Sequence, residues 1–197
     1  VPGKVVSVEY DPNRSGRIAL VSYVDGEYRY ILCPEGMRPG DQVLAGRNLP
    51  VRNGYAMPLS DIPVGVEVHN IQLRPQGKSF MVRSAGTSAQ LMAKEDKWAV
   101  IRLPSREIRK VDVNCFATIG RVSNPDHKDI TIGKAGRVRH RGRRPRVRAV
   151  AMNPVDHPMG GGEGKSSGGR HPCSKSGLAA KGARTRNRKK KSSRLIA

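Results

Sequence analysis

Apolar and polar residues alternate through the first 120 residues of this 197-residue chain, and the alternation is lost from about Gly133 onward. Alternation places successive side chains on opposite faces of a β-strand, whereas a helix needs apolar residues every three or four positions. The first part of the chain is therefore expected to form strands around a core. The second part has no pattern with which to build one.

Short strand-like runs separated by turn residues fill this first part. Asp25-Gly26 lies between two such runs, and this dipeptide favours a tight hairpin because glycine accepts the positive φ of the turn. Many short strands in so few residues predict an all-β fold of small closed barrels. Pro58, Pro63 and Gly65 interrupt the pattern, so we expect one barrel over residues 1–62 and a second over 63–132. The runs are 6–10, 18–24, 27–32, 67–73, 89–93, 98–103 and 106–111.

Positive charge is concentrated in the remaining part of the chain. Residues 1–120 contain 16 Lys and Arg against 12 Asp and Glu, whereas residues 121–197 contain 21 against four, a net charge of +17. Such a segment cannot bury enough apolar surface to offset its chain entropy. We expect residues 133–197 to be an extended tail, disordered alone and ordered against a polyanion. Its expected nucleic-acid contacts are Lys134, Arg137, Arg139, Arg141, Arg143, Arg144, Arg146, Arg148, Lys165, Arg170, Lys181, Arg184, Arg186 and Arg188.

The cysteine and histidine spacing predicts neither a disulfide framework nor a metal centre. Cys33, Cys115 and Cys173 are odd in number and never paired as CxxC, which favours a reducing compartment. His157, His171 and Cys173 lack the paired spacing of structural zinc sites. We expect no cofactor beyond Mg²⁺ associated with nucleic acid. No run of about 18 apolar residues occurs, so no membrane partner is expected.

Two other functions have partial motifs in the tail. Arg141-Gly142-Arg143-Arg144-Pro145 is similar to the minor-groove hook of architectural DNA-binding proteins, although an extra Arg precedes the proline. Residues 160–167 approach a phosphate-binding nucleotide loop that contains Lys165, but Met159 stands where its first glycine is required. DNA binding is the alternative that we keep; nucleotide hydrolysis is disfavoured.

Five segments, in order, resemble the ribosomal protein L2 family of the large subunit, in its bacterial or organellar form. They are Glu-Tyr-Asp-Pro-Asn-Arg-Ser (9–15), Ile-Pro-Val-Gly (62–65), Arg-Ser-Ala-Gly-Thr (83–87), Gly-Lys-Ala-Gly (133–136) and Met-Asn-Pro-Val-Asp-His-Pro (152–158), the last followed by Gly-Gly-Gly-Glu-Gly (160–164). The resemblance implies an oligonucleotide-binding-type (OB) barrel, an SH3-like barrel and a tail that penetrates large-subunit rRNA.

The resemblance also implies a function and a location. The protein would be a structural constituent of the large ribosomal subunit near the peptidyl-transferase region, in a bacterial cytoplasm or an organelle. It would support subunit assembly, subunit association and tRNA placement in translation, beside neighbouring ribosomal proteins and the small subunit. The reaction centre of the family is RNA, so the chain is not expected to be an enzyme.

Particular residues inherit roles from the resemblance. Arg14 and Arg83 are implied rRNA contacts, and Gly86 would let the backbone approach the sugar-phosphate chain. His157 falls on the family histidine once proposed to assist peptide-bond formation, but Met159 replaces a second histidine. We expect His157 to be a structural or RNA-contacting residue. Family members carry an opening strand before the position of Val1, so the first barrel is expected to lack one strand.

Overall fold

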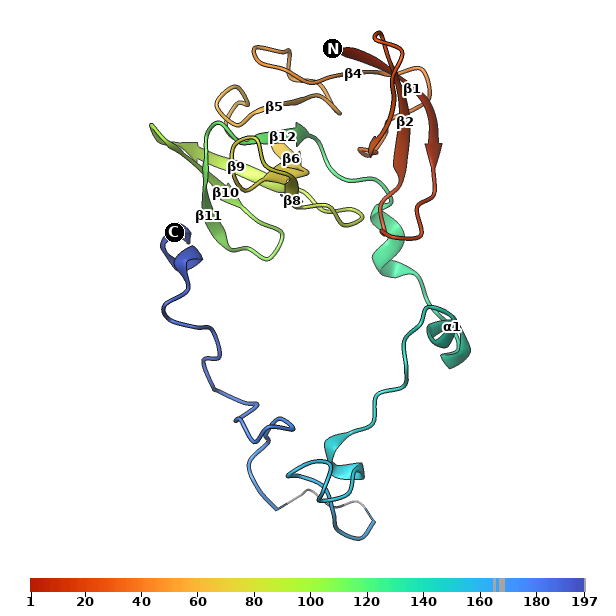
Figure 1. Cartoon of the computed structure of the whole chain (residues 1–197), viewed down its shortest axis with the longest axis vertical. Helices are drawn as coiled ribbons and strands as arrows, with labels where there is room; N and C mark the ends of the chain where they lie inside the picture. Colours follow the sequence, from red (N-terminus) through yellow and green to blue (C-terminus); the bar gives the residue numbers. More distant parts are fainter. Residues whose placement is uncertain (165, 167–168, 197) are drawn as a thin grey trace. The chain divides into compact units, whose positions relative to one another are not determined.

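The expected all-β class is confirmed in a computed structural model, which describes residues 1–164, 166 and 169–196. Two antiparallel sheets and a small hairpin contain all the strands of the described residues (Figure 1). Helical segments are short and lie after residue 124. Two separate apolar clusters, one for each large sheet, form the core.

The first sheet has four strands in the order β3-β2-β1-β4. Val5 pairs with Val21 across β1 and β2, and both are buried with Ala19, Cys33 and Val43 in the smaller core. The expected hairpin at Asp25-Gly26 is present, with Gly26 at φ +83° and the Tyr23 amide donating to the Glu27 carbonyl at 2.9 Å. The strands are β1 (Pro2–Glu9), β2 (Ile18–Tyr23), β3 (Tyr28–Leu32) and β4 (Gln42–Leu44).

The second sheet has six strands in the order β11-β10-β9-β6-β12-β5. Its core includes Met57, Leu59 and Ile62, which lie within residues 1–62, the range expected for the first barrel. They belong here because β5 pairs with β12, whose alanine at position 117 is also buried. The strands are β5 (Ala56–Pro58), β6 (Glu67–His69), β9 (Ala89–Lys94), β10 (Trp98–Arg102), β11 (Ile108–Asp112) and β12 (Phe116–Ile119).

One expected strand is interrupted. The run 67–73 divides at Asn70, whose φ of +52° ends β6 and starts β7 (Ile71–Gln72). β7 pairs with β8 (Ser79–Met81) in a separate two-stranded hairpin, and its Ile71 is buried in the larger core. This hairpin leads directly into the Arg83 loop.

The segment 121–124 joins the two sheets into one compact unit. Val122 is buried and forms a bridge with Pro34, and the Ser123 amide donates to the Cys33 carbonyl at 3.0 Å. The Arg17 amide donates to the Ser123 hydroxyl at 3.1 Å. These contacts fix the turns of the first sheet against the loops of the second.

Residues 131–190 form a separate unit, and those of them that the structure describes have almost no interior. They contain α1 (Ala135–His140) and a short 3-10 helix, η2 (Ala149–Ala151). His157 is the only buried residue among those described from 131 to 196. No helix in the described part of the chain is long and apolar enough to cross a membrane.

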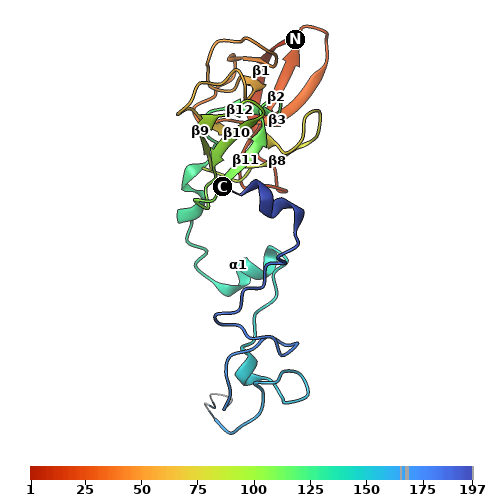
Figure 2. The same cartoon turned by 90° about the vertical axis from the view of Figure 1, so that its left-hand side faces the viewer.

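The end of the described chain lies against the six-stranded sheet. The 3-10 helix η3 (Lys191–Leu195) contacts β11, and Ile196 forms an antiparallel bridge with Arg109 (Figure 2). Another 3-10 helix, η1 (Pro125–Asp129), follows the segment that joins the sheets. The expected tail of 133–197 thus includes a terminal piece grouped with the barrels.

Candidate nucleic-acid interface

The turn after β1 holds Arg14 in a fixed orientation. Asp11 is nearly buried, and one of its carboxylate oxygens accepts from the Asn13 amide at 2.8 Å. The other accepts from Nε of Arg14 at 2.5 Å. The Asn13 amide and then the Arg14 guanidinium lower the pKa of Asp11, so the carboxylate stays charged at neutral pH. The Arg14 side chain remains about one-third exposed, at 34%.

The loop after β8 holds Arg83. The Arg83 guanidinium donates to the Ser79 carbonyl at 3.2 Å, which ties it to the strand just before it. The Ser84 carbonyl accepts from the Thr87 amide at 3.2 Å and from the Thr87 hydroxyl at 2.7 Å, closing the loop. Arg83 itself is exposed. Both arginines therefore project from turns whose own hydrogen bonds fix them.

Ser15 brings the two turns together. Its hydroxyl accepts from the Ala85 amide at 3.0 Å, and its carbonyl accepts from the Asn124 side-chain amide at 2.8 Å. A hollow of about 410 Å³ opens beside this contact, lined by Asn13, Arg14, Ser15, Arg83 and Ser84. Two guanidinium groups with hydroxyl and amide groups between them can receive a phosphate through charge-assisted hydrogen bonds.

Packing within the protein requires a glycine at position 86. Its φ is +64°, and a Cβ there would lie 2.7 Å from Cα of Pro125. Its amide donates to the carbonyls of Val122 and Ser123. Gly86 thus seats the Arg83 loop against the segment that joins the sheets, and its contact with an RNA backbone stays a prediction.

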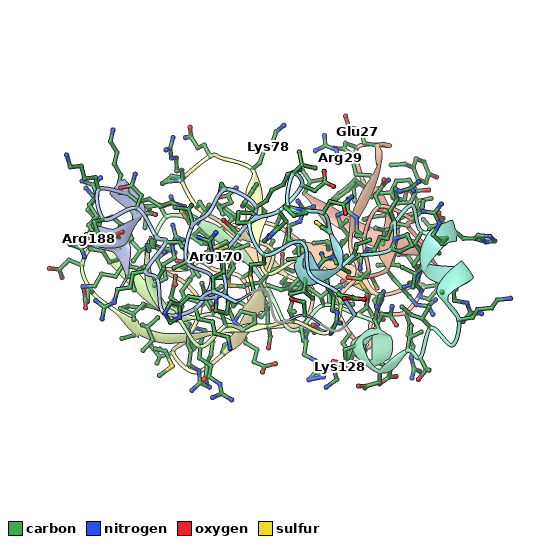
Figure 3. The ribbon with its side chains drawn as sticks, turned by 90° about the horizontal axis from the view of Figure 1, so that it is seen from below. Glu27, Arg29, Lys78, Lys128, Arg170 and Arg188 are labelled. Carbon is green, nitrogen blue, oxygen red and sulfur yellow. The ribbon has the colours of Figure 1, made fainter. Side chains whose placement is uncertain are left out.

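The expected basic contacts of the tail are solvent-exposed wherever the structure describes them. Arg137 and Arg139 lie on α1, which the loss of apolar periodicity did not predict. Gly142, at φ +76°, ends this helix, and the chain continues without regular structure to Arg148. Figure 3 labels the exposed Arg170 and Arg188. Lys165 lies outside the described residues. The remaining exposed members are Lys134, Arg141, Arg143, Arg144, Arg146, Lys181, Arg184 and Arg186.

His157 is built into a closed loop over residues 152–161. Its Nδ1 accepts from the Met159 amide at 3.1 Å, and its own amide donates to the Asn153 carbonyl at 3.2 Å. The Gly161 amide donates to the Met152 carbonyl at 2.9 Å, which closes the loop. The first of these bonds uses the ring as a structural acceptor, and the other two join backbone groups.

The other chemistries considered from the sequence find no assembled site in the described residues. No group of three or more His, Cys, Asp or Glu side chains that could hold a metal ion occurs there. The nucleotide-loop hypothesis depends on Lys165, which is not described, and no helix follows among residues 169–190. The hook-like segment begins at the C-terminal cap of α1.

The sequence did not single out Ser15 or Asn124, which join the two arginine-bearing turns. Both are small polar residues within turn motifs, where local hydrogen bonding is the usual explanation. Asn124 has a φ of +64° before Pro125, and the Asn-Pro dipeptide does indicate a turn. Their partners are about 70 and 109 residues away in sequence, so no local signal could identify the contacts.

Comparisons with known proteins agree with this arrangement. The family model "Ribosomal Proteins L2, RNA binding N-terminal domain" matches residues 1–45, and "Ribosomal Proteins L2, C-terminal domain" matches residues 52–177. A curated relative from Cytophaga hutchinsonii, "Large ribosomal subunit protein uL2", is 58% identical over 196 residues, which cover 100% of this chain and 70% of the relative. The two sheets are thus the OB-type and SH3-like barrels expected from the resemblance. The chain belongs to the ribosomal protein L2 family.

Proposed function

We propose that this chain is a structural protein of the large ribosomal subunit that binds large-subunit rRNA near the peptidyl-transferase region. The RNA-binding description of the N-terminal family model and the name of the Cytophaga hutchinsonii relative support a role at the ribosome. Through this binding the chain contributes to subunit assembly, to association with the small subunit and to tRNA placement. Its other partners are neighbouring ribosomal proteins.

The observation that carries the proposal is the combination of charge and burial in residues 131–190. This stretch contains 17 Lys and Arg residues against two acidic residues, and His157 is the only buried residue among those described there. A chain without a core does not repay its ordering entropy by itself. Phosphates supply the missing stabilisation, because each cation that meets one releases condensed counterions.

The barrels fix the register of the tail on the RNA. Arg14 and Arg83 lie on the same hollow but come from different barrels, so a phosphate held there sets the position of both barrels at once. Guanidinium groups suit this task because their planar fork of donors matches two phosphate oxygens. Recognition of irregular rRNA then depends on shape and on 2′-hydroxyl groups along the tail.

The proposed role is not enzymatic. His157 contributes an acceptor to the backbone of its own loop, which supports a structural function for the ring. Any Mg²⁺ at the interface would be held mainly by RNA phosphates, because the tail contains only two carboxylate side chains in residues 131–190.

The test is whether the endogenous protein sediments with large ribosomal subunits in a high-salt gradient. Co-sedimentation is expected, because many phosphate contacts and a threaded tail dissociate slowly. A protein that stays at the top of the gradient contradicts the proposal. A competition assay between large-subunit rRNA and AT-rich duplex DNA tests the architectural alternative, which predicts preference for the DNA.

A further inference from the structure

An exposed phenylalanine lies directly beside the hollow that is lined by Arg14 and Arg83. Phe80 is 75% exposed at the centre of β8, and neither sheet core includes it. It lines a hollow of about 480 Å³ together with Met81, Val82, Leu103 and Pro104. A group of neighbouring apolar side chains at the surface, unlike a single exposed one, indicates a surface that binds a partner.

This apolar hollow shares lining residues with two other hollows, each of which contains two arginines. It shares Arg83 and Ser84 with the hollow that also contains Arg14. It shares Leu103 and Pro104 with a third hollow of about 670 Å³, lined also by Glu67, Ser88, Gln90, Arg102 and Arg106. The sequence of surfaces is therefore basic, aromatic and basic. Phosphates and bases also alternate along a single RNA strand.

The backbone is strained on both sides of the aromatic hollow. Val82 has a φ of +55° and Arg106 a φ of +68°, conformations that side chains with a Cβ rarely adopt. Val82 is held there by packing against the larger core and by the Asn70 amide, which donates to its carbonyl at 2.9 Å. Strain of this kind persists only where the surroundings over-determine it, and it gathers at binding sites. Here it fixes the turn between Phe80 and Arg83.

We propose that the Phe80 hollow binds one unpaired RNA base, stacked on the phenyl ring, while the phosphates on either side meet the Arg14–Arg83 and Arg102–Arg106 hollows. The proposal rests on the proposed function and adds a subsite to it. The positive charge on both sides favours RNA over an apolar protein side chain. The guanidinium of Arg83, tied to the Ser79 carbonyl, couples the phosphate position to the strand that contains Phe80.

The first experiment measures binding of the full chain to a 20-nucleotide single-stranded RNA and to the matched RNA duplex over a salt series. Phe80→Ala is expected to weaken single-strand binding about 5- to 150-fold at every salt concentration, the range found for loss of one stacked base. The slope of log affinity against log salt stays unchanged, because no cation is removed. Duplex binding stays unchanged too, because its bases are already paired.

Conservative variants separate stacking from packing. Phe80→Trp is expected to retain single-strand affinity because it keeps an aromatic face. Phe80→Leu keeps most of the apolar volume but has no aromatic face, so it is expected to lose as much affinity as Phe80→Ala. Tyr28→Ala, at another exposed aromatic residue on β3, is the matched control and is expected to change nothing. Equal losses for Tyr28→Ala and Phe80→Ala, or full affinity for Phe80→Leu or Phe80→Ala, overturn the proposal.

The second experiment identifies the occupant in the ribosome. Assembled large subunits that contain p-benzoylphenylalanine in place of Phe80 are irradiated, and an adduct to rRNA is expected. An adduct to a neighbouring protein overturns the proposal. Different results would contradict the proposed function. The chain would not co-sediment with large subunits, and Arg83→Ala would leave the salt slope of RNA binding unchanged. If only the Phe80 variants bind RNA as the unmodified chain does, the base-binding proposal is wrong and the proposed function still stands.

Discussion

Arg14 and Arg83 make a candidate phosphate-binding site because their neighbours hold them in place. Asp11 orients the first guanidinium and the Ser79 carbonyl orients the second, so little side-chain entropy remains to be lost when a phosphate arrives. An exposed arginine without such support is usually a solvated side chain. The pair is therefore expected to contribute more to RNA binding than its formal charge alone.

Replacing Arg14 or Arg83 with Ala should weaken binding to large-subunit rRNA about tenfold or more, the scale of a charge-assisted hydrogen bond. Each change should also reduce the log–log salt slope by about one. Lys in place of either arginine should restore the slope but not the full affinity, because an ammonium lacks the planar fork. Filter binding measures both quantities, the affinity and the salt slope.

Arg38→Ala, at an exposed arginine away from the hollow, is the control. A loss at Arg38 equal to that at Arg83 would refute a specific site.

His69 makes the stability of the larger barrel depend on pH. The side chain is fully buried, its Nδ1 lies 2.9 Å from the Gly120 carbonyl, and its Nε2 has no partner among the described residues. Burial lowers its pKa, although the hydrogen bond to Gly120 acts in the opposite direction. The folded protein therefore binds a proton at His69 less readily than the unfolded chain does.

The free energy of unfolding should fall as the pH drops below about 6.5, the ordinary pKa of histidine. The loss contributed by one such group approaches about 1.4 kcal/mol per pH unit and ends at the folded-state pKa. Urea titrations of the full chain between pH 7.5 and 5 measure it. His69→Gln should be less stable at pH 7.5 but lack this contribution to the slope. An identical pH dependence in the variant would show that His69 is not the cause.

At the scale of elements, the longer strands were predictable from apolar runs bounded by turn residues. The runs 18–24, 27–32 and 98–103 agree closely with β2, β3 and β10, since each is a mostly apolar run of six or seven residues with a turn signal at one end. β4, β5 and β12 were not anticipated. They have three or four residues and receive their partners from distant parts of the chain, so local pattern does not specify them.

The local structure of the tail could not be predicted from the periodicity of apolar residues either. α1 has six residues, too few for an apolar stripe, and His157 organises its loop through backbone hydrogen bonds. The bridge between Cys173 and Ala179 likewise depends on backbone groups. What the residues did predict is the near absence of buried side chains in the described part of this unit, because charge and glycine content are properties of composition.

The loop 152–161 is expected to act as a structural element. His157→Asn keeps an acceptor near the Nδ1 position and should leave single-turnover peptide transfer by assembled ribosomes nearly unchanged. His157→Gln should also leave transfer nearly unchanged. His157→Ala removes the acceptor for the Met159 amide, and reduced incorporation of the protein into subunits is its expected effect. A slowing of peptide transfer by about 100-fold in His157→Gln ribosomes, the scale of a lost general base, would contradict this role.

At the scale of the whole molecule, affinity should be dominated by counterion release. If about six to ten cations meet phosphates, binding to large-subunit rRNA should weaken by about three to five decades between roughly 50 and 200 mM salt. Replacing Arg143, Arg144 and Arg146 together with Gln should lower the log–log slope by about three. Equilibrium binding at several salt concentrations provides the slopes. A slope that does not change in the triple variant would mean that this part of the tail stays in solvent.

The central claim is that residues 133–190 take a fixed conformation only when RNA is bound, whereas the two barrels are folded without RNA. Hydrogen exchange on the full chain, with and without large-subunit rRNA, tests this claim most directly. Without RNA, amides in β1, β2, β9 and β10 should be protected, and those of the tail should exchange at nearly the rate of an unfolded peptide. Addition of rRNA should protect the tail as well. Strong protection of residues 133–190 in the absence of RNA would contradict the account.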